Sequence, residues 1–126
     1  MAKIDRFEDL HSWQKARELV NIVFDLTGEG DFARDFELRN QIRRAAGSSM
    51  HNIAEGFDAG SNPEFIRFLK IARRSASEVQ SQLYLACDRN YINQSELQKT
   101  YNTATEVKRL INGMIAYLRK HAELSN

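Results

Sequence analysis

The sequence predicts an all-α protein, an up-down-up-down antiparallel four-helix bundle. Apolar residues make up 42% of the 126 residues, enough to form one packed core. The chain contains one proline and six glycines, and this scarcity argues against a loop-rich or all-β protein. Apolar side chains also recur at three- and four-residue steps in four separate segments, as expected for helices that bury one face.

The first helix is predicted over residues 9–27. Its apolar face comprises Leu10, Trp13, Ala16, Val20, Val23, Phe24 and Thr27. Asp9 is the expected N-cap, since a carboxylate can accept from the free N–H groups of the first turn. The segment from Gly28 to Gly30 is expected to end the helix, because glycine tolerates the left-handed backbone found at helix C-termini.

The second helix is predicted over residues 35–55, followed by a break near Gly56 and Gly60. Its inward stripe comprises Leu38, Ile42, Ala45, Ala46, Ser49 and Ile53. Most of these side chains are small, so a neighbouring helix can approach closely.

The third helix is predicted over residues 63–89. Its seam follows the a and d positions of three heptads: Phe65, Leu69, Ala72, Ala76, Val79, Leu83 and Ala86. Asn62 followed by Pro63 is a strong start signal, combining a capping side chain with a proline at the first helical position. Ser61 with Glu64 offers a capping box as the alternative start.

The fourth helix is predicted over residues 95–120. Its seam comprises Leu97, Tyr101, Ala104, Ile111, Ile115 and Leu118. Ser95 and Gln98 have the spacing of a capping box. Arg119 and Lys120 fall in the last turn, where positive charge suits the helix dipole.

The organisation of the chain is expected to be simple. The connections are short, so residues 1–126 are predicted to form a single domain. The N-terminus is charged, unlike a signal peptide, and Cys87 is the only cysteine. We therefore expect a reduced, cytoplasmic protein.

Catalytic chemistry is not expected. Glu8 and His11 have the Glu-x-x-His spacing of a di-metal bundle, but this motif occurs once. His51 and Glu55 are a single pair one helical turn apart. No nucleophile–base set and no glycine-rich phosphate loop can be assembled. The sequence thus predicts a protein that is not an enzyme and has no cofactor and no metal site.

Basic residues are the stronger functional signal. The net charge is only +1, yet residues 38–77 contain seven basic and three acidic residues. Those basic residues are Arg39, Arg43, Arg44, Arg67, Lys70, Arg73 and Arg74. They predict helix faces that bind nucleic acid by neutralising phosphates. One alternative is that these residues form a solvated charged face. The other is that they form salt bridges with residues 1–37 of another subunit, a segment with nine acidic and five basic residues.

Polar side chains also fall near the small seam residues of the second and third helices. They are Asn52, Glu55, Ser75 and Glu78. Buried polar groups need partners, so we expect a network that fixes helix register or an oligomer contact. A ligand site is the alternative interpretation.

Several phenylalanines fall at helix ends or away from the seams: Phe7, Phe32, Phe36, Phe57 and Phe68. Either they cover the ends of the bundle, or they remain exposed and form a subunit interface.

The ordered motifs resemble those of the four-helix bundle proteins encoded by intervening sequences in bacterial 23S rRNA genes, which are also described as ribosomal-protein-like. The matching motifs are Trp13 to Ala16, Gln41 to Ala46, Asn52 to Gly56, and Phe65 with Phe68-Leu69, Ile71-Ala72, Ser75 and Glu78. The sequence departs from the family at Arg74, where glycine is usual, and near Gly47 and Ser49, where larger apolar residues are usual.

This resemblance implies a homo-oligomer, with a closed ring of five subunits. It also implies similarity to the accessory protein of diversity-generating retroelements, which binds nucleic acid and a reverse transcriptase. The expected partners are therefore further copies of the chain and RNA or DNA, with no membrane. A protein-interaction adaptor, for example for a reverse transcriptase, is the alternative function.

Overall fold

The computed structural model describes residues 4–125 of the chain, and it describes the side chains of residues 4–121. All regular structure within this range is helical, and the predicted all-helical bundle is confirmed. The elements in chain order are the 3-10 turn η1 (Phe7–Asp9) and the helices α1 (His11–Thr27), α2 (Gly30–Arg34), α3 (Phe36–Phe57), α4 (Asn62–Asp88) and α5 (Gln94–Ser125). No helix in the described range is long and apolar enough to cross a bilayer.

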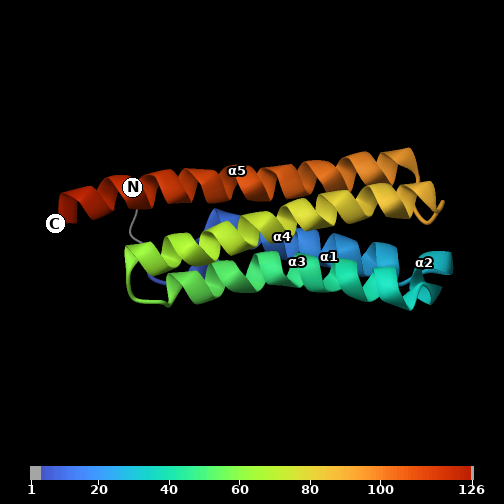
Figure 1. Cartoon of the computed structure of the whole chain (residues 1–126), viewed down its shortest axis with the longest axis horizontal. Coiled ribbons are helices and arrows are strands. Elements are labelled where there is room, and N and C mark those ends of the chain that lie inside the picture. The colour runs from blue at the N-terminus through green and yellow to red at the C-terminus, as the bar shows by residue number, and fades with distance from the viewer. Residues whose placement is uncertain (1–3, 126) are drawn as a thin grey trace.

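The four long helices lie side by side in an elongated bundle (Figure 1). α1 packs against α3 and α5, and α4 packs against the same two helices, so α1 and α4 occupy opposite corners. The α1–α3 and α4–α5 connections lie at one end of the bundle, and the α3–α4 connection lies at the other (Figure 1). At the latter end, α5 extends beyond its neighbours.

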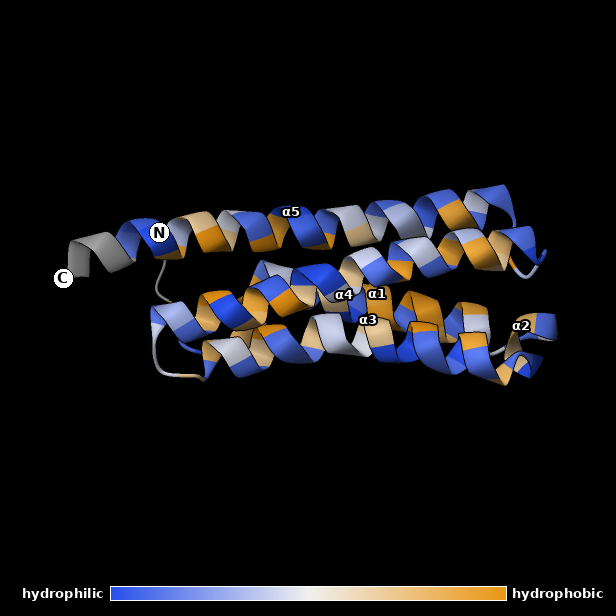
Figure 2. Ribbon diagram, in the orientation of Figure 1, coloured by the Kyte–Doolittle hydropathy of each residue, from blue (hydrophilic) through white to orange (hydrophobic). Residues whose placement is uncertain are grey.

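The buried apolar residues form one cluster between the helices. Hydrophobic positions alternate with polar ones along each helix in Figure 2, as the periodicity predicts. The predicted seams of α3 and α4 are buried at every position. One residue of the α1 seam was assigned wrongly: Phe24 is 45% exposed, and Leu19 is fully buried in the core.

Two of the predicted helix starts were wrong in detail. Asp9 lies in η1, and α1 begins after Leu10 without a side-chain cap. α5 is capped by Asn93 and Glu96 rather than by Ser95 and Gln98: Asn93 Oδ1 accepts from Glu96 N at 2.8 Å, and Glu96 Oε1 accepts from Asn93 N at 2.9 Å. These two bonds form a reciprocal capping box two residues earlier than expected.

α4 starts at the alternative capping box, Ser61 with Glu64. Ser61 is the N-cap, and its Oγ accepts from Glu64 N at 3.3 Å. Asn62 instead reaches across the bundle and donates to the carbonyl of Leu118 at 3.4 Å. At the other end of the chain, α5 continues past the expected stop at residue 120.

The connection between α1 and α3 holds a short helix, α2, which the sequence analysis missed. Phe32 of α2 is 1% exposed, which confirms for this residue the alternative that it covers an end of the bundle. Its ring stacks on Tyr91, with centroids 5.2 Å apart. Five residues are too few to show helical periodicity, which explains why the pattern failed here.

Candidate nucleic-acid interface

The outward side of α4 carries Arg67, Lys70 and Arg74, and we call these three residues the α4 basic stripe. They are spaced at three and four residues, so they share one helix face, and all three are exposed. Arg67 is engaged with its own helix: it forms a 3.0 Å ion pair with Glu64, and its guanidinium lies 4.5 Å from the centroid of the Phe68 ring. Hydrogen bonding from Arg67 lowers the pKa of Glu64.

Lys70 and Arg74 are the unpaired cations of this stripe. No carboxylate in the described part of the chain lies within ion-pair distance of either side chain. Arg44 of α3 is likewise exposed and unpaired in that range. These three cations can therefore bind an external anion without first breaking an internal ion pair.

Arg39 and Arg43 of α3 contact the neighbouring helices α2 and α1 instead. Arg43 Nε donates to Thr27 Oγ1 of α1 at 2.7 Å, and its guanidinium lies 4.3 Å from the centroid of Phe24. Arg39 Nη1 donates to the carbonyl of Ala33 at 3.0 Å. Both arginines are half-buried: Arg43 lies at the seam between α1 and α3, and Arg39 lies where α3 meets α2.

Arg73 lies on the side of α4 that faces α5. Its Nη1 donates to Asn112 Oδ1 of α5 at 2.7 Å. The seven predicted basic residues are thus not one surface. The structure divides them among the outward sides of α3 and α4, the α1–α3 seam, the α2–α3 contact and the α4–α5 seam.

Three arginines of α1 and α3 lie against aromatic rings: Arg17 and Arg39 contact a ring of their own helix, whereas Arg43 contacts Phe24 across the α1–α3 seam. Arg17 lies 5.7 Å from the Trp13 ring, Arg43 lies 4.3 Å from Phe24, and Arg39 lies 4.7 Å from Phe36. Arg17 was not among the predicted basic residues, and Phe24 was wrongly assigned to the core, whereas the assignment of Trp13 to the core is confirmed. The available signal was the spacing of Trp13, Arg17 and Phe24, which places all three on one face of α1.

The polar residues on the α3–α4 seam form a chain of hydrogen bonds. Asn52 Nδ2 donates to Ser48 Oγ at 3.0 Å, and Ser48 and Ser75 share a 2.8 Å hydrogen bond between the two helices. Ser75 Oγ in turn donates to the carbonyl of Ile71 at 3.0 Å. A hydroxyl has one proton, so Ser48 must donate to Ser75. The chain is satisfied internally and fixes the register of the two helices.

The two carboxylates of the predicted network lie outside this chain. Glu55 is exposed on α3, and Glu78 is exposed on α4, where it accepts from Gln82 Nε2 at 3.2 Å. Of the four predicted residues, only Asn52 and Ser75 are brought together, through Ser48. Ser48 was not among the residues predicted for this network.

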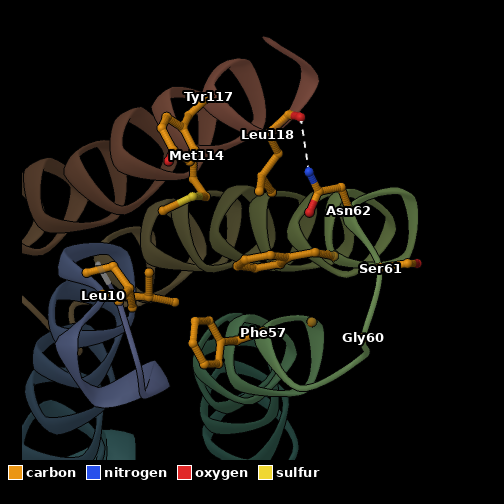
Figure 3. Close-up of a pocket in the computed structure, with 11 residues that line it drawn as sticks. Leu10, Phe57, Gly60, Ser61, Asn62, Met114, Tyr117 and Leu118 are labelled. Carbon is orange, nitrogen blue, oxygen red and sulfur yellow. Dashed lines mark hydrogen bonds between the residues drawn. The ribbon is translucent and has the colours of Figure 1, made fainter. Parts of the chain in front are cut away.

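A hollow of about 510 Å³ opens at the end of the bundle where α3 passes into α4. Figure 3 shows Leu10, Phe57, Met114 and Tyr117 around it, with the Asn62 bond to Leu118 at its edge. None of its lining residues is an acid or a base. The hollow therefore offers no charged group for catalysis or for binding phosphate.

The two residue pairs considered for metal binding do not form a cluster. Glu8 accepts from Arg6 at 2.7 Å, and His11 is exposed at the start of α1. His51 and Glu55 are exposed on α3. Among the described residues, no group of three His, Cys, Asp or Glu side chains could hold a metal ion.

Comparisons with known proteins place these features in a family context. The family model of the 23S rRNA-intervening sequence protein matches residues 8–113. This range includes the α4 basic stripe and the hydrogen-bonded residues of the α3–α4 seam. A crystal structure of a protein of unknown function from the S23 ribosomal protein family of Bacteroides thetaiotaomicron is 31% identical and superposes with a TM-score of 0.70. The match covers 82% of this chain and 94% of that one. A search of curated proteins found no match.

Proposed function

This chain belongs to the 23S rRNA-intervening sequence protein family, and we propose that it is a non-enzymatic, oligomeric RNA-binding protein. Its subunit is an up-down-up-down antiparallel bundle that presents basic helix faces to RNA. The neighbouring S23 structure is described as a protein of unknown function. The proposal therefore depends on the surface of this chain rather than on a known activity of a relative.

The single observation that carries the proposal is the set of unpaired cations on adjacent helices, Lys70 and Arg74 of α4 and Arg44 of α3. All three are exposed, and none has a carboxylate partner in the described range. A polyanion that binds such cations releases its condensed counterions, which favours binding most strongly at low salt. The hydrogen-bonded Ser48–Ser75 contact holds α3 and α4 in register and so keeps the cations in a fixed arrangement.

The second half of α4 supports the oligomer. Beyond Arg74 the outward positions include Ser77, Ser81, Tyr84 and Leu85. Tyr84 is 54% exposed and Leu85 is 44% exposed. Exposed apolar side chains next to small polar ones suit a contact between copies. We propose a closed homopentamer, in which several copies of the α4 basic stripe act on one RNA and raise its affinity.

RNA binding is tested by fluorescence anisotropy of a labelled RNA over a series of salt concentrations. We expect Arg44→Ala with Lys70→Ala and Arg74→Ala to weaken binding and to flatten the dependence of log affinity on log salt. The slope should fall by about 0.7 for each lost phosphate contact with a single strand. The matched control is Lys99→Ala with Arg119→Ala and Lys120→Ala, which removes three exposed charges from α5.

No affinity at low salt, or equal effects of the two triple variants, would refute RNA binding by these faces. The same assay with DNA of matched length decides between the two nucleic acids. Capture of a protein partner such as a reverse transcriptase, without any RNA affinity, would replace the proposal with the adaptor function. Light scattering of wild type and of Tyr84→Ser with Leu85→Ser tests the oligomer, and an unchanged mass would exclude this contact.

A further inference from the structure

We propose that the α1–α3 seam is a single-stranded RNA site at which unpaired bases stack on aromatic rings and arginine planes. The arginine–aromatic surface comprises Arg17, Phe24, Phe36, Arg39 and Arg43. This inference rests on the proposed RNA binding and goes beyond it, because it names a second surface, a mode of contact and a class of RNA.

The contact between Arg43 and Phe24 is held in place from both helices. Arg43 lies on α3, its Nε donates to Thr27 Oγ1 of α1 at 2.7 Å, and its guanidinium covers Phe24 of α1 at 4.3 Å. Thr27 Oγ1 is itself fixed by a 2.7 Å bond to the carbonyl of Val23. The plane of the guanidinium and the plane of the ring are therefore positioned before any ligand arrives.

A second contact of the same kind lies one helical turn away. Arg39 precedes Arg43 by four residues, so the two arginines are neighbours on one face of α3. The Arg39 guanidinium lies 4.7 Å from the centroid of Phe36, and a 3.0 Å bond to the carbonyl of Ala33 holds it. Phe36 is 63% exposed and Phe24 is 45% exposed. The Arg43–Phe24 pair and the Arg39–Phe36 pair are therefore neighbours, and both are partly accessible to a base that could stack on them.

The arginines of this surface favour a partner that carries negative charge. Arg17, Arg39 and Arg43 take part in no ion pair within the described part of the chain. Glu37, the acidic residue closest in sequence to Arg39 on α3, is exposed, and its Oε1 accepts from Gln41. A purely apolar partner would bury three unpaired arginines at high cost. A strand of phosphates and bases satisfies both the arginines and the exposed rings.

The aromatic component favours single strands over duplexes. The bases of a duplex are already stacked on one another, whereas unpaired bases can stack on aromatic side chains and on guanidinium planes. Such stacking tolerates any sequence and is sensitive to loss of the ring. The ring beside the α4 basic stripe, Phe68, is half-buried and lies against Arg67, whereas Phe24 and Phe36 are exposed. We therefore expect the α4 basic stripe to contact phosphates rather than bases. The two surfaces therefore make different predictions for the same RNA.

The test uses a single-stranded RNA containing 2-aminopurine, whose fluorescence falls when the base stacks, and a duplex of the same length. The variant is Phe24→Leu with Phe36→Leu, which keeps apolar side chains but removes the aromatic faces. We expect it to bind the single strand at least fivefold more weakly, to lose the fluorescence change, and to bind the duplex as wild type does. Tyr117→Leu removes an exposed aromatic at the other end of the bundle and should leave all three readouts unchanged.

A second variant keeps the positive charges of the surface and removes the planar guanidinium groups. Arg39→Lys with Arg43→Lys should reduce the fluorescence change while leaving the salt dependence close to that of wild type. The inference is overturned if both double variants bind the single strand like wild type, or if they change only the mass of the assembly, which would make the seam a subunit contact. Binding by wild type with no preference for single strands and no fluorescence change would leave RNA binding standing and refute stacking. Absence of RNA binding altogether would refute the proposed function itself.

Discussion

The Tyr91 hydroxyl donates a 2.9 Å hydrogen bond to Asp35 Oδ2, and so joins two connections that are far apart in the sequence. Asp35 caps α3, because its Oδ1 accepts from Leu38 N at 3.1 Å. Tyr91 lies between α4 and α5, and its ring stacks on Phe32 of α2. One end of the bundle is therefore closed by a contact that involves α2, α3 and the α4–α5 connection.

This contact predicts a stability difference that depends on pH. The pKa of Asp35 is lowered by the hydrogen bond from Leu38 N–H and then by the one from the Tyr91 hydroxyl. A lowered pKa in the folded state stabilises the fold above the unfolded value of about 3.9, and this contribution is lost as the pH falls through the folded value. Tyr91 has a raised pKa, chiefly because of its bond to Asp35, so its contribution is complete below about 10 and is lost as the pH rises further.

We therefore expect Tyr91→Phe to unfold at a lower urea concentration than wild type at neutral pH. The difference between the two unfolding midpoints should become smaller below about pH 4, because Asp35 becomes protonated there. Circular dichroism during urea unfolding at a series of pH values measures this difference. Tyr101→Phe is the control, because the structure shows no hydrogen bond from its hydroxyl to the described residues. A difference that is the same in acid and at neutral pH would contradict this prediction.

Two glycines of α3 should respond to alanine in opposite ways. A Cβ at Gly56 would lie 2.8 Å from Phe68 Cβ and 2.9 Å from Phe65 Cδ1, closer than real contacts allow. Gly56→Ala should push α3 and α4 apart and lower the free energy of unfolding by about 1–3 kcal/mol. A Cβ at Gly47 would meet only the His51 side chain, at 3.7 Å. Gly47→Ala should therefore raise stability by about 0.5–1 kcal/mol, since alanine is the better helix former.

Thermal and urea unfolding of the two glycine variants and wild type provide the measurement. The two variants change the same residue type in the same helix, so each serves as the control for the other. A Gly56→Ala protein as stable as wild type would show that the close approach of α3 and α4 is not required.

The serine contact between α3 and α4 can be tested with an exposed serine of another helix as control. Ser75→Ala removes the acceptor of the Ser48 hydroxyl in a half-buried seam, and we expect a loss of about 1–2 kcal/mol in the free energy of unfolding. Ser95 is exposed on α5, outside the proposed subunit contact, and Ser95→Ala should change stability by less than about 0.5 kcal/mol. Equal effects of the two variants in urea unfolding would argue against a structural role for the contact.

The positions of the long helices were predictable because each buries one continuous stripe. The seams of α3 and α4 repeat at three- and four-residue steps, and every residue assigned to them is buried. Local periodicity carries this information without knowledge of any neighbour. Helix ends were less predictable, because Asp9 and Ser95 have suitable capping side chains that the backbone does not use.

The candidate site was only partly predictable, for a different reason. The sequence identifies seven basic residues, but it does not say which neighbouring helix each one meets. Arg43 donates a hydrogen bond to Thr27 of α1, and Arg73 donates one to Asn112 of α5. Lys70 and Arg74 remain exposed. Phe24 was mispredicted for the same reason. Its spacing along α1 fits the core, but its ring is 45% exposed and lies against Arg43 of α3.

By itself the sequence determined the all-helical class, the helix faces that are buried and the presence of a basic middle segment. These depend on residue type and on spacing along one helix. Only the tertiary structure decided that Phe32 is buried against Tyr91, that Gly56 must lack a side chain and that Arg43 of α3 lies against Phe24 of α1. Each of these depends on distances between atoms of different helices, which become fixed only when the helices pack.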